Sequence, residues 1–486
     1  MNLGDRIRSG AKWLAFGNIG NQIIQFCVGI LLARLLVPED FGMLVTVQAF
    51  TGLAGFVAGG GMGQALVRAK EITEKDFHVV FTMQMAIGCV LYTVFYSIAP
   101  YFAHWFGDPL YEYLLRVSAT YFLLRPFSNM YNSWLQREMH YKQQSIRRVV
   151  LSIFTSILTA TAAWAGMGVW SLVLGGLIGT MLSIVVLRAI TPYRPQLYFD
   201  PTIAKRHSSY GAKIAAIDVI TYLKNQAPNI IISRISGAHL VGLFNKADSM
   251  AKIPFAAVNG PIYQPVFRSL SIAQDNPDQA KYIFFRTISL LAVYTLPLYI
   301  GLAWCSTPLI SFLYGEKWTG SSGALEILAI SGTLYCIHHP AGAVLAAFNR
   351  LGSELVAQIC LLIIITVGIL LTLSHGLEAV AWILLLGHIY ITTHLYYLAT
   401  RCFPHRLIEL FRAIKPGILL NCILIATLAT VHTLLPTNFS LTHQGAYLAV
   451  TIAAGGMVYG LSFLFLPIKA LATESARWRK MLHLGA

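Results

Sequence analysis

The sequence predicts an all-helical protein that crosses a membrane fourteen times. Of its 486 residues, 56% are hydrophobic and only 11% are charged, whereas an ordinary soluble domain has about 25% charged residues. Apolar runs of about 20 residues, each long enough to cross the hydrocarbon layer, recur along the chain. No soluble core could bury that much apolar surface, so the composition argues against a soluble enzyme.

Polar breaks divide the apolar runs into two groups of six and a final pair. The first group is expected at residues 11–36, 42–66, 79–102, 112–135, 149–165 and 169–187. The second is expected at residues 208–236, 240–267, 284–309, 323–348, 354–373 and 377–400, and the final pair at 410–435 and 445–466. These groups predict an N-terminal lobe over 1–200, a C-terminal lobe over 201–405, and two further helices with a cytoplasmic tail over 406–486.

The loops between the predicted spans differ in charge on the two sides of the membrane. One side collects 27 of the 35 Lys and Arg residues, and the opposite side holds only Arg34, Arg234 and Lys317. Cytoplasmic loops retain basic residues, so both termini are predicted to be cytoplasmic, which agrees with an even number of spans. The first helix is expected to be retained, because its apolar stretch is longer than that of a cleaved signal.

A shift of 200 residues superimposes part of the chain on itself. Six residues then coincide without a gap: Ile30, Arg34, Gly42, Gly60, Gln64 and Arg68 fall on Ile230, Arg234, Gly242, Gly260, Gln264 and Arg268. Further along, the turn 106–108 is similar to 314–316, and Pro126 is similar to Pro340. Two parallel six-helix repeats predict a cavity between two lobes and transport by alternating access.

Five basic residues fall inside predicted spans, where a charge costs about 2.5 to 3.5 kcal/mol. Arg125 is central in its span, precedes a proline and has no carboxylate near it in sequence. A guanidinium fork binds phosphate or carboxylate oxygens in a bidentate manner, so Arg125 is a candidate for holding an anionic group. The alternative is an ion pair between helices.

The other cations have similar pairs of interpretations. Lys224 is a second candidate anion contact, or a partner of Asp218 or Asp248. Lys246 is predicted either to contact the substrate or to extend its side chain to the membrane surface. Lys252 follows Asp248 by four residues, the favoured spacing of a helical ion pair. The remaining buried basic residue is Arg116.

Uncharged and outer polar positions complete the candidate cavity. The first span carries a polar stripe at helical spacing, formed by Asn18, Asn21, Gln22 and Gln25. Arg34 and Arg234 occupy matching outer positions, and either line the mouth of the cavity or lie at the membrane interface. His338 and His339 suggest proton relay or helix packing, and the glycines of 59–63 suggest close helix packing.

The opening of the chain contains the segments Asn21-Gln22-Ile23-Ile24-Gln25-Phe26, Ala33-Arg34-Leu35-Leu36 and Pro38-Glu39-Asp40-Phe41-Gly42. These residues resemble the start of the Wzx-type polysaccharide flippases of the multidrug/oligosaccharidyl-lipid/polysaccharide exporter superfamily. The branch that exports colanic and teichuronic acids is the most similar. The resemblance implies a bacterial inner-membrane protein that turns an undecaprenyl-pyrophosphate-linked oligosaccharide toward the periplasm.

This resemblance also implies the partners of the protein. They are the lipid-linked glycan, membrane lipid and a polysaccharide polymerase with its chain-length machinery. A monomer is expected, with no cofactor, no metal and no nucleic acid. The alternative is a cation-coupled multidrug antiporter of the same superfamily, for which Asp218 and Asp248 are the candidate acids. A glycan-modifying membrane enzyme is disfavoured because the predicted outer loops are short.

Overall fold

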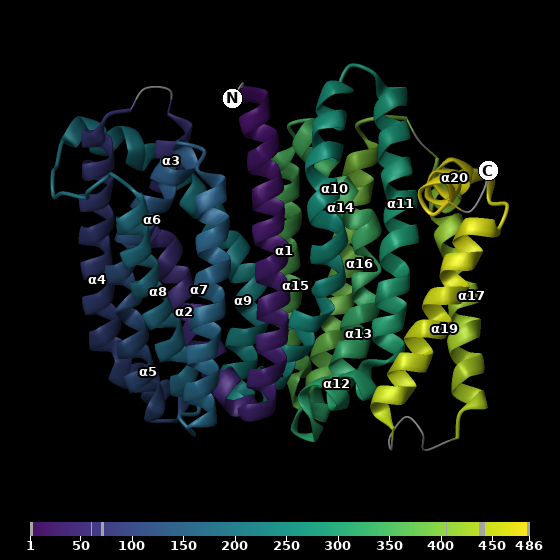
Figure 1. The fold of residues 1–486 in the computed structure, drawn as a ribbon, viewed down its shortest axis with the longest axis horizontal. Coiled ribbons are helices and arrows are strands. Elements are labelled where there is room, and N and C mark those ends of the chain that lie inside the picture. The colour runs from purple at the N-terminus through teal and green to yellow at the C-terminus, as the bar shows by residue number, and fades with distance from the viewer. Residues whose placement is uncertain (1–2, 60, 70–71, 405, 437–442, 484–486) are drawn as a thin grey trace. The chain divides into compact units, whose positions relative to one another are not determined.

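The computed structural model describes residues 3–59, 61–69, 72–404, 406–436 and 443–483. Over these ranges the regular secondary structure is helical, and no strand is formed. The chain divides into two compact units, Met1–Gly242 and Leu243–Ala486, which are treated separately below (Figure 1). The predicted lobe boundaries at 200 and 405 stay predictions.

The first unit is built from eight helices and most of a ninth within its described residues. They are α1 (Leu3–Leu35), α2 (Pro38–Gly59), α3 (Met62–Arg68), α4 (Glu74–Phe106), α5 (Leu110–Ala119), α6 (Tyr121–Arg137), α7 (Tyr141–Trp164), α8 (Val169–Ile190) and the long α9 (Pro201–Ala251). Helix α9 is interrupted at Gly237, where φ is 80°. That conformation is open to glycine and costly for other residues, and it coincides with the expected break between spans 208–236 and 240–267.

The predicted span 112–135 is two helices rather than one. Helices α5 and α6 join at Thr120, six residues before Pro126. A proline has no N–H group to donate to the carbonyl four residues earlier, which here belongs to Phe122. Gly88 of α4 packs directly against that carbonyl, where a Cβ would come 2.5 Å from the oxygen. The sequence-based span was continuous because no glycine or polar cluster marks the break.

The second unit continues with helices of similar length. They are α10 (Ile253–Ile272), α11 (Pro277–Trp304), α12 (Ser306–Tyr314), α13 (Ser322–Gly332), α14 (Tyr335–Ala347), α15 (Leu351–Thr372), α16 (Leu377–Thr400), α17 (Leu407–Leu434), α19 (Gln444–Phe465) and α20 (Ala472–Met481), with short 3₁₀ turns at Glu316–Ser321, Leu373–His375 and Lys469–Leu471. The predicted span 323–348 is also broken, since the helical segments Glu316–Gly332 and Tyr335–Ala347 meet at 48°.

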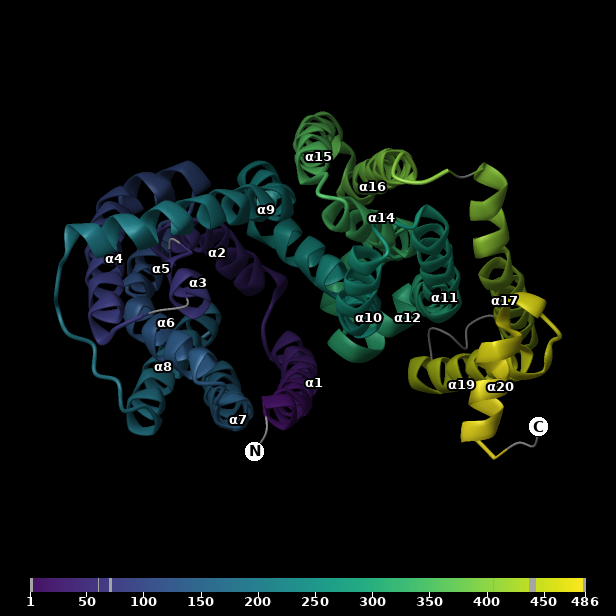
Figure 2. The same ribbon diagram turned by 90° about the horizontal axis from the view of Figure 1, so that it is seen from above.

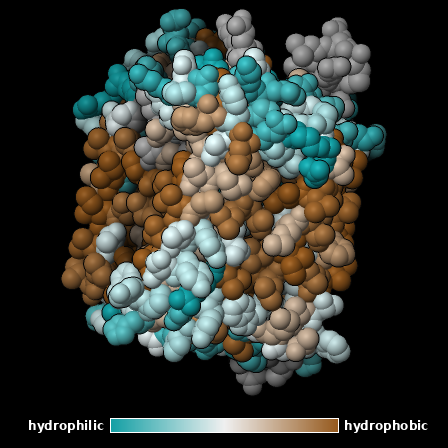
Figure 3. Space-filling view, turned by 90° about the vertical axis from the view of Figure 1, so that its left-hand side faces the viewer, coloured by the Kyte–Doolittle hydropathy of each residue, from teal (hydrophilic) through white to brown (hydrophobic). Residues whose placement is uncertain are grey.

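Ten helices of the described chain are long and apolar enough to cross a membrane, or eleven if the bent pair counts as one span. The three other predicted spans, 112–135, 208–236 and 240–267, are those that contain the five basic residues expected within spans. Seen from the side of α4, a broad apolar band separates a hydrophilic upper zone from a more polar lower zone (Figure 3). The protein is therefore a multi-pass membrane protein, while the number fourteen and the repeat stay predictions.

Small residues bring the helices of the first unit close together. Helix α1 packs along α7 (Figure 2), with Gly17 of α1 against Ser145 of α7. On the other side of α7, Gly175 and Gly179 of α8 lie against Thr159 and Thr155. Such small-residue contacts let membrane helices approach closely. They place the polar face of α7 between α1 and α8.

Candidate functional site: cations and a polar cavity in the first unit

Arg125 lies inside the first unit, facing the glycines of α2. A Cβ added at Gly55 would collide with its Nη1 atom, and one at Gly59 would lie 3.4 Å from Nη2. Within the described part of the chain, Arg125 forms no hydrogen bond or ion pair. The ion pair between helices, considered from the sequence, is therefore not formed by the described residues.

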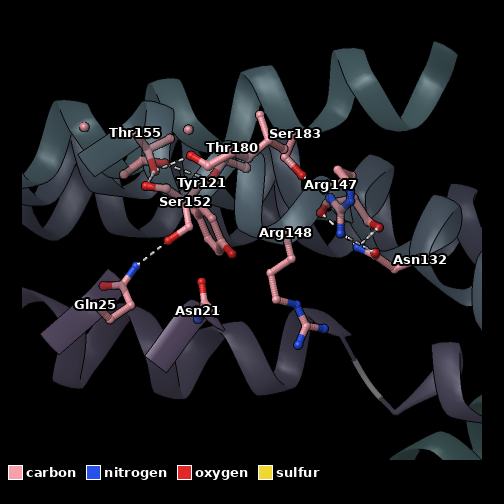
Figure 4. A pocket seen from close by; sticks show the side chains of 15 residues that line it. Asn21, Gln25, Tyr121, Asn132, Arg147, Arg148, Ser152, Thr155, Thr180 and Ser183 are labelled. Atoms are coloured by element: carbon pink, nitrogen blue, oxygen red, sulfur yellow. Dashed lines mark hydrogen bonds between the residues drawn. The ribbon is translucent and has the colours of Figure 1, made fainter. Parts of the chain in front are cut away.

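The polar stripe of α1 faces α7. Gln25 donates from Nε2 to Ser152 Oγ over 3.2 Å, and Arg148 donates from Nη1 to Asn18 Oδ1 over 2.6 Å. Asn21 and Gln25 line a cavity of about 350 Å³ formed with α6, α7 and α8 (Figure 4). Its wall also comprises Tyr121, Ser128, Asn132, Arg147, Arg148, Leu151, Ser152, Thr155, Gly175, Gly176, Gly179, Thr180 and Ser183.

Arg147 is held in this cavity by neutral groups. It donates from Nη2 to Asn132 Oδ1 over 3.0 Å and from Nη1 to Ser183 Oγ, so that α6 and α8 both orient it (Figure 4). Its Nε is buried without a hydrogen-bond partner. No carboxylate occurs among the described residues that line the cavity. The cavity therefore combines a positive charge with neutral hydrogen-bonding groups.

Sequence reasoning missed Arg147 and Arg148 as site residues. Both were counted among the basic loop residues because the span was expected to begin at 149, whereas α7 begins at Tyr141. Arg147 thus lies about 9 Å along the helix. A polar stripe could have revealed this face, because its members recur every three or four residues: Gln144, Arg148, Ser152, Thr155 and Thr159.

The remaining candidates of the first unit are dispersed. Lys224 and Asp218 are half-buried on α9, and Asp218 forms no ion pair with the described residues. Arg34 is exposed in the last turn of α1. Arg234 is also exposed, and its guanidinium carbon lies 5.8 Å from the ring centre of Trp105. Such a cation–π contact gives Arg234 a structural role at the end of α4.

The candidates of the second unit have partners. Lys252 and Asp248 form the expected pair, with 2.5 Å between Nζ and Oδ2. The half-buried Lys246 has its Nζ 4.4 Å from the ring centre of Tyr314 and 5.3 Å from that of Trp318. Trp318 is fully buried. Lys246 therefore packs against an aromatic wall.

A buried acid marks the end of the first unit at which α4 and α9 begin. Asp76 is 2% exposed and accepts hydrogen bonds from His207 Nε2 over 2.8 Å, from Thr73 N over 2.9 Å, and from Arg206. In the segment that connects α8 to α9, burial raises the pKa of the Tyr193 hydroxyl. The hydrogen bonds of Asp76 connect the start of α9 to α4, so Asp76 has a structural role.

Comparison with known proteins identifies the family to which this chain belongs. Residues 31–323, more than half of the chain, match the model of a family described as polysaccharide biosynthesis protein. The chain belongs to this family. It is 25% identical to the teichuronic acid biosynthesis protein TuaB of Bacillus subtilis (strain 168), with 98% of each chain covered. It is 24% identical to the lipopolysaccharide biosynthesis protein WzxC of Escherichia coli (strain K12), with 72% of each covered.

The fold of this polysaccharide biosynthesis protein is that of a known flippase. It superimposes on the lipid II flippase MurJ in an inward closed conformation with a TM-score of 0.72, at 16% identity, covering 96% of this chain and 99% of MurJ. The predicted resemblance to polysaccharide flippases, which is strongest at the start of the chain, is confirmed. The protein is a multi-pass membrane protein of a family of polysaccharide biosynthesis proteins.

Proposed function

We propose that the protein moves undecaprenyl-pyrophosphate-linked oligosaccharides from the cytoplasmic to the periplasmic leaflet of the bacterial inner membrane by alternating access. The observation that carries the proposal is Arg125, a guanidinium inside a helical unit with no ion-pair partner among the described residues. A cation that is costly to place in a membrane is explained by an anionic substrate. Lys224 and Lys246 are further proposed contacts for the pyrophosphate or an acidic sugar.

Three structural correspondences support the proposed repeat. Gly107 ends α4 with φ of 77°, and Gly315 ends α12 with φ of 92°. The helix breaks at Thr120 and at Leu334 each precede a proline, Pro126 or Pro340, by six residues.

The third correspondence is a reciprocal contact within the first unit. A Cβ at Gly42 would collide with the carbonyl of Ala238, and one at Gly242 would collide with the carbonyl of Pro38. Under the shift of 200, Gly42 corresponds to Gly242 and Pro38 corresponds to Ala238, so the two contacts are equivalent. Equivalent contacts are expected for two repeats that meet around a local two-fold axis. Glu39 and His239, which are also 200 residues apart, pair over 2.6 Å.

The helix order of the first unit supports the proposed orientation. The start of α4, the end of α6, the start of α7 and the end of α8 lie at one end of this unit (Figure 1). These helix ends adjoin the basic segments predicted to be cytoplasmic, including Lys75, Arg137, Lys142 and Arg188. Under the positive-inside rule, this arrangement supports a cytoplasmic location for this end of the unit, where the first helix also begins.

The multidrug antiporter is less well supported. An antiporter for cations needs an acid that is available to its substrate. Asp248 is already paired with Lys252, which leaves Asp218 as the acid without an ion pair among the described candidates.

The test is deletion of the gene followed by analysis of the lipid pool of the cytoplasmic leaflet. Undecaprenyl-linked repeat units should accumulate, and the wild-type gene should clear them. A normal pool with a normal surface glycan would overturn the proposal and favour drug export. Complementation with Arg125→Ala and Lys224→Ala together then tests the anion contacts, which are wrong if glycan export survives both changes.

A further inference from the structure

The cavity between α1, α6, α7 and α8 is lined mainly by residues that carry polar side chains. Six hydroxyl groups line it, from Tyr121, Ser128, Ser152, Thr155, Thr180 and Ser183, together with three amides, from Asn21, Gln25 and Asn132. Hydroxyls and amides both donate and accept hydrogen bonds, as the hydroxyls of a sugar do. Leu151 is the one large aliphatic side chain among the described lining residues. Ser152, Asn132 and Ser183 already form hydrogen bonds within the protein, and the further lone pairs of their oxygens can accept hydrogen bonds from the hydroxyls of a sugar.

The charge of the cavity specifies the second property of its ligand. Arg147 is fixed by Asn132 and Ser183, retains a buried unpartnered Nε, and has no acidic group in the described wall. Arg148 adds a second positive charge on the same helix. Hydrogen bonds between ionised partners are about twice as strong as neutral ones, so the complement of this wall is an anionic group.

The glycines of α8 shape the cavity in two ways. A Cβ at Gly175 or Gly179 would press on Thr159 or Thr155, so these two glycines serve helix packing. A Cβ at Gly176 would meet no atom within 4 Å, although Gly176 lines the cavity. At Gly176, the wall of the cavity is therefore formed by backbone atoms alone, and a side chain added there would meet no neighbouring atom.

We propose that this cavity binds an acidic sugar residue of the transported glycan, with its carboxylate at Arg147 and its hydroxyls at the surrounding hydroxyl and amide groups. The inference rests on the proposed function and specifies its substrate class. The volume of about 350 Å³ lies near the lower end of the range of about 300 to 1,000 Å³ for small-molecule sites. It suits a small polar unit.

Binding is tested on the full-length protein in nanodiscs of neutral phosphatidylcholine, with saturation-transfer NMR as the readout. The probes are methyl glucuronide and its uncharged counterpart, methyl glucoside. We expect the glucuronide to bind about tenfold or more tightly, as one charge-assisted hydrogen bond implies. Arg147→Gln should abolish this preference. Arg188→Gln, which removes an exposed charge elsewhere on α8, should preserve it.

Equal binding of the two probes, or an unchanged preference in Arg147→Gln, would overturn the proposal. Competition arms distinguish other anions. Displacement of the glucuronide by equimolar inorganic pyrophosphate, or by phosphatidylglycerol included in the nanodisc, would assign the cavity to a phosphate group and refute the sugar.

A second variant tests the site independently, in case Arg147→Gln fails to fold. Gly176→Leu should fold, because its Cβ meets no neighbour and leucine favours helices, yet it should fill the cavity and abolish glucuronide binding. Gly456→Leu, at an exposed glycine of α19 with equally open surroundings, should leave binding intact. Unchanged binding in Gly176→Leu would refute the site. If glucuronide fails to bind while the deletion strain accumulates lipid-linked units, the inference fails and the proposed function stands.

Discussion

The two units differ in whether the basic residues among their helices have carboxylate partners. In the first unit, Arg125 and Arg147 lie among helices without a carboxylate partner in the described structure. In the second unit, Lys252 pairs with Asp248, Lys281 pairs with Glu409 over 2.6 Å, and Arg286 pairs with Glu474 over 3.1 Å. The latter two pairs connect α11 to α17 and to α20.

This contrast separates two uses of charge. A paired cation contributes modestly to stability and is available for little else. An unpaired cation in a helical unit destabilises the protein unless a substrate supplies its partner. We therefore expect changes of unpaired cations in the first unit to affect transport, and changes of paired cations to affect stability.

The largest effect is expected at the buried carboxylate of the first unit. Asp76→Asn removes the charge that accepts hydrogen bonds from Thr73 N, from the buried His207 and from the exposed Arg206, and each hydrogen bond to a charged group contributes about 1.5 to 3 kcal/mol. The free energy of unfolding in mixed detergent micelles measures this loss. Glu39→Gln is the control, because its pair with His239 is about half exposed, and it should cost less than about 1 kcal/mol. Equal losses in both variants would contradict the distinction between buried and exposed pairs.

The next effect is on transport. Arg125→Gln should reduce glycan export about tenfold to a hundredfold, since one charge-assisted hydrogen bond contributes about 1.5 to 3 kcal/mol. Its unfolding free energy should stay unchanged or rise, because no ion pair is lost. Export is measured as surface glycan in the complemented deletion strain at equal protein levels. A destabilised variant with normal export would reverse the roles assigned to the two kinds of cation.

A smaller effect is expected from moving the guanidinium instead of removing it. The Cβ of Gly55→Ala would displace Nη1 of Arg125, whereas that of Gly59→Ala would lie 3.4 Å from Nη2. Gly55 lies in the interior of α2 and Gly59 is its last residue, so alanine favours the helix at Gly55 at least as much as at Gly59. Export should therefore fall several-fold for Gly55→Ala and remain close to wild type for Gly59→Ala. Equal export by the two variants would show that the position of Arg125 does not matter.

The smallest effect is expected at Lys252. This side chain is 54% exposed, and an exposed helical pair contributes about 0.5 kcal/mol or less. Lys252→Gln should therefore change neither the unfolding free energy measurably nor the amount of surface glycan. A marked loss of export would show that a paired cation of the second unit also serves the substrate.

The sequence predicted the features that depend on neighbouring residues. Helices follow from apolar runs, the interruption near Gly237 from a small polar segment, and the Lys252 pair from the spacing of four. The breaks at Thr120 and between α13 and α14 were missed, because a proline acts on a carbonyl four residues earlier and on the helix packed against it.

The polar cavity could be predicted only in part. The stripe containing Asn21 and Gln25 was expected to line a cavity between the two lobes, whereas it lines a cavity within the first unit. Its partner Ser152 is 127 residues away from Gln25, and no local pattern connects them. Arg147 was assigned to a loop because the apolar run begins after it, whereas the helix begins before it. Partners brought together by tertiary packing leave no local signature.

The open space beside Gly176 also makes the cavity accessible to chemistry. A thiol introduced by Gly176→Cys would stand in the cavity without disturbing its neighbours. In a background that lacks the exposed native thiols Cys27, Cys89 and Cys422, membrane-impermeant maleimides applied from either face would label it only while the cavity opens toward that face. The rate of labelling from each face would then report alternating access, and bound substrate should lower this rate.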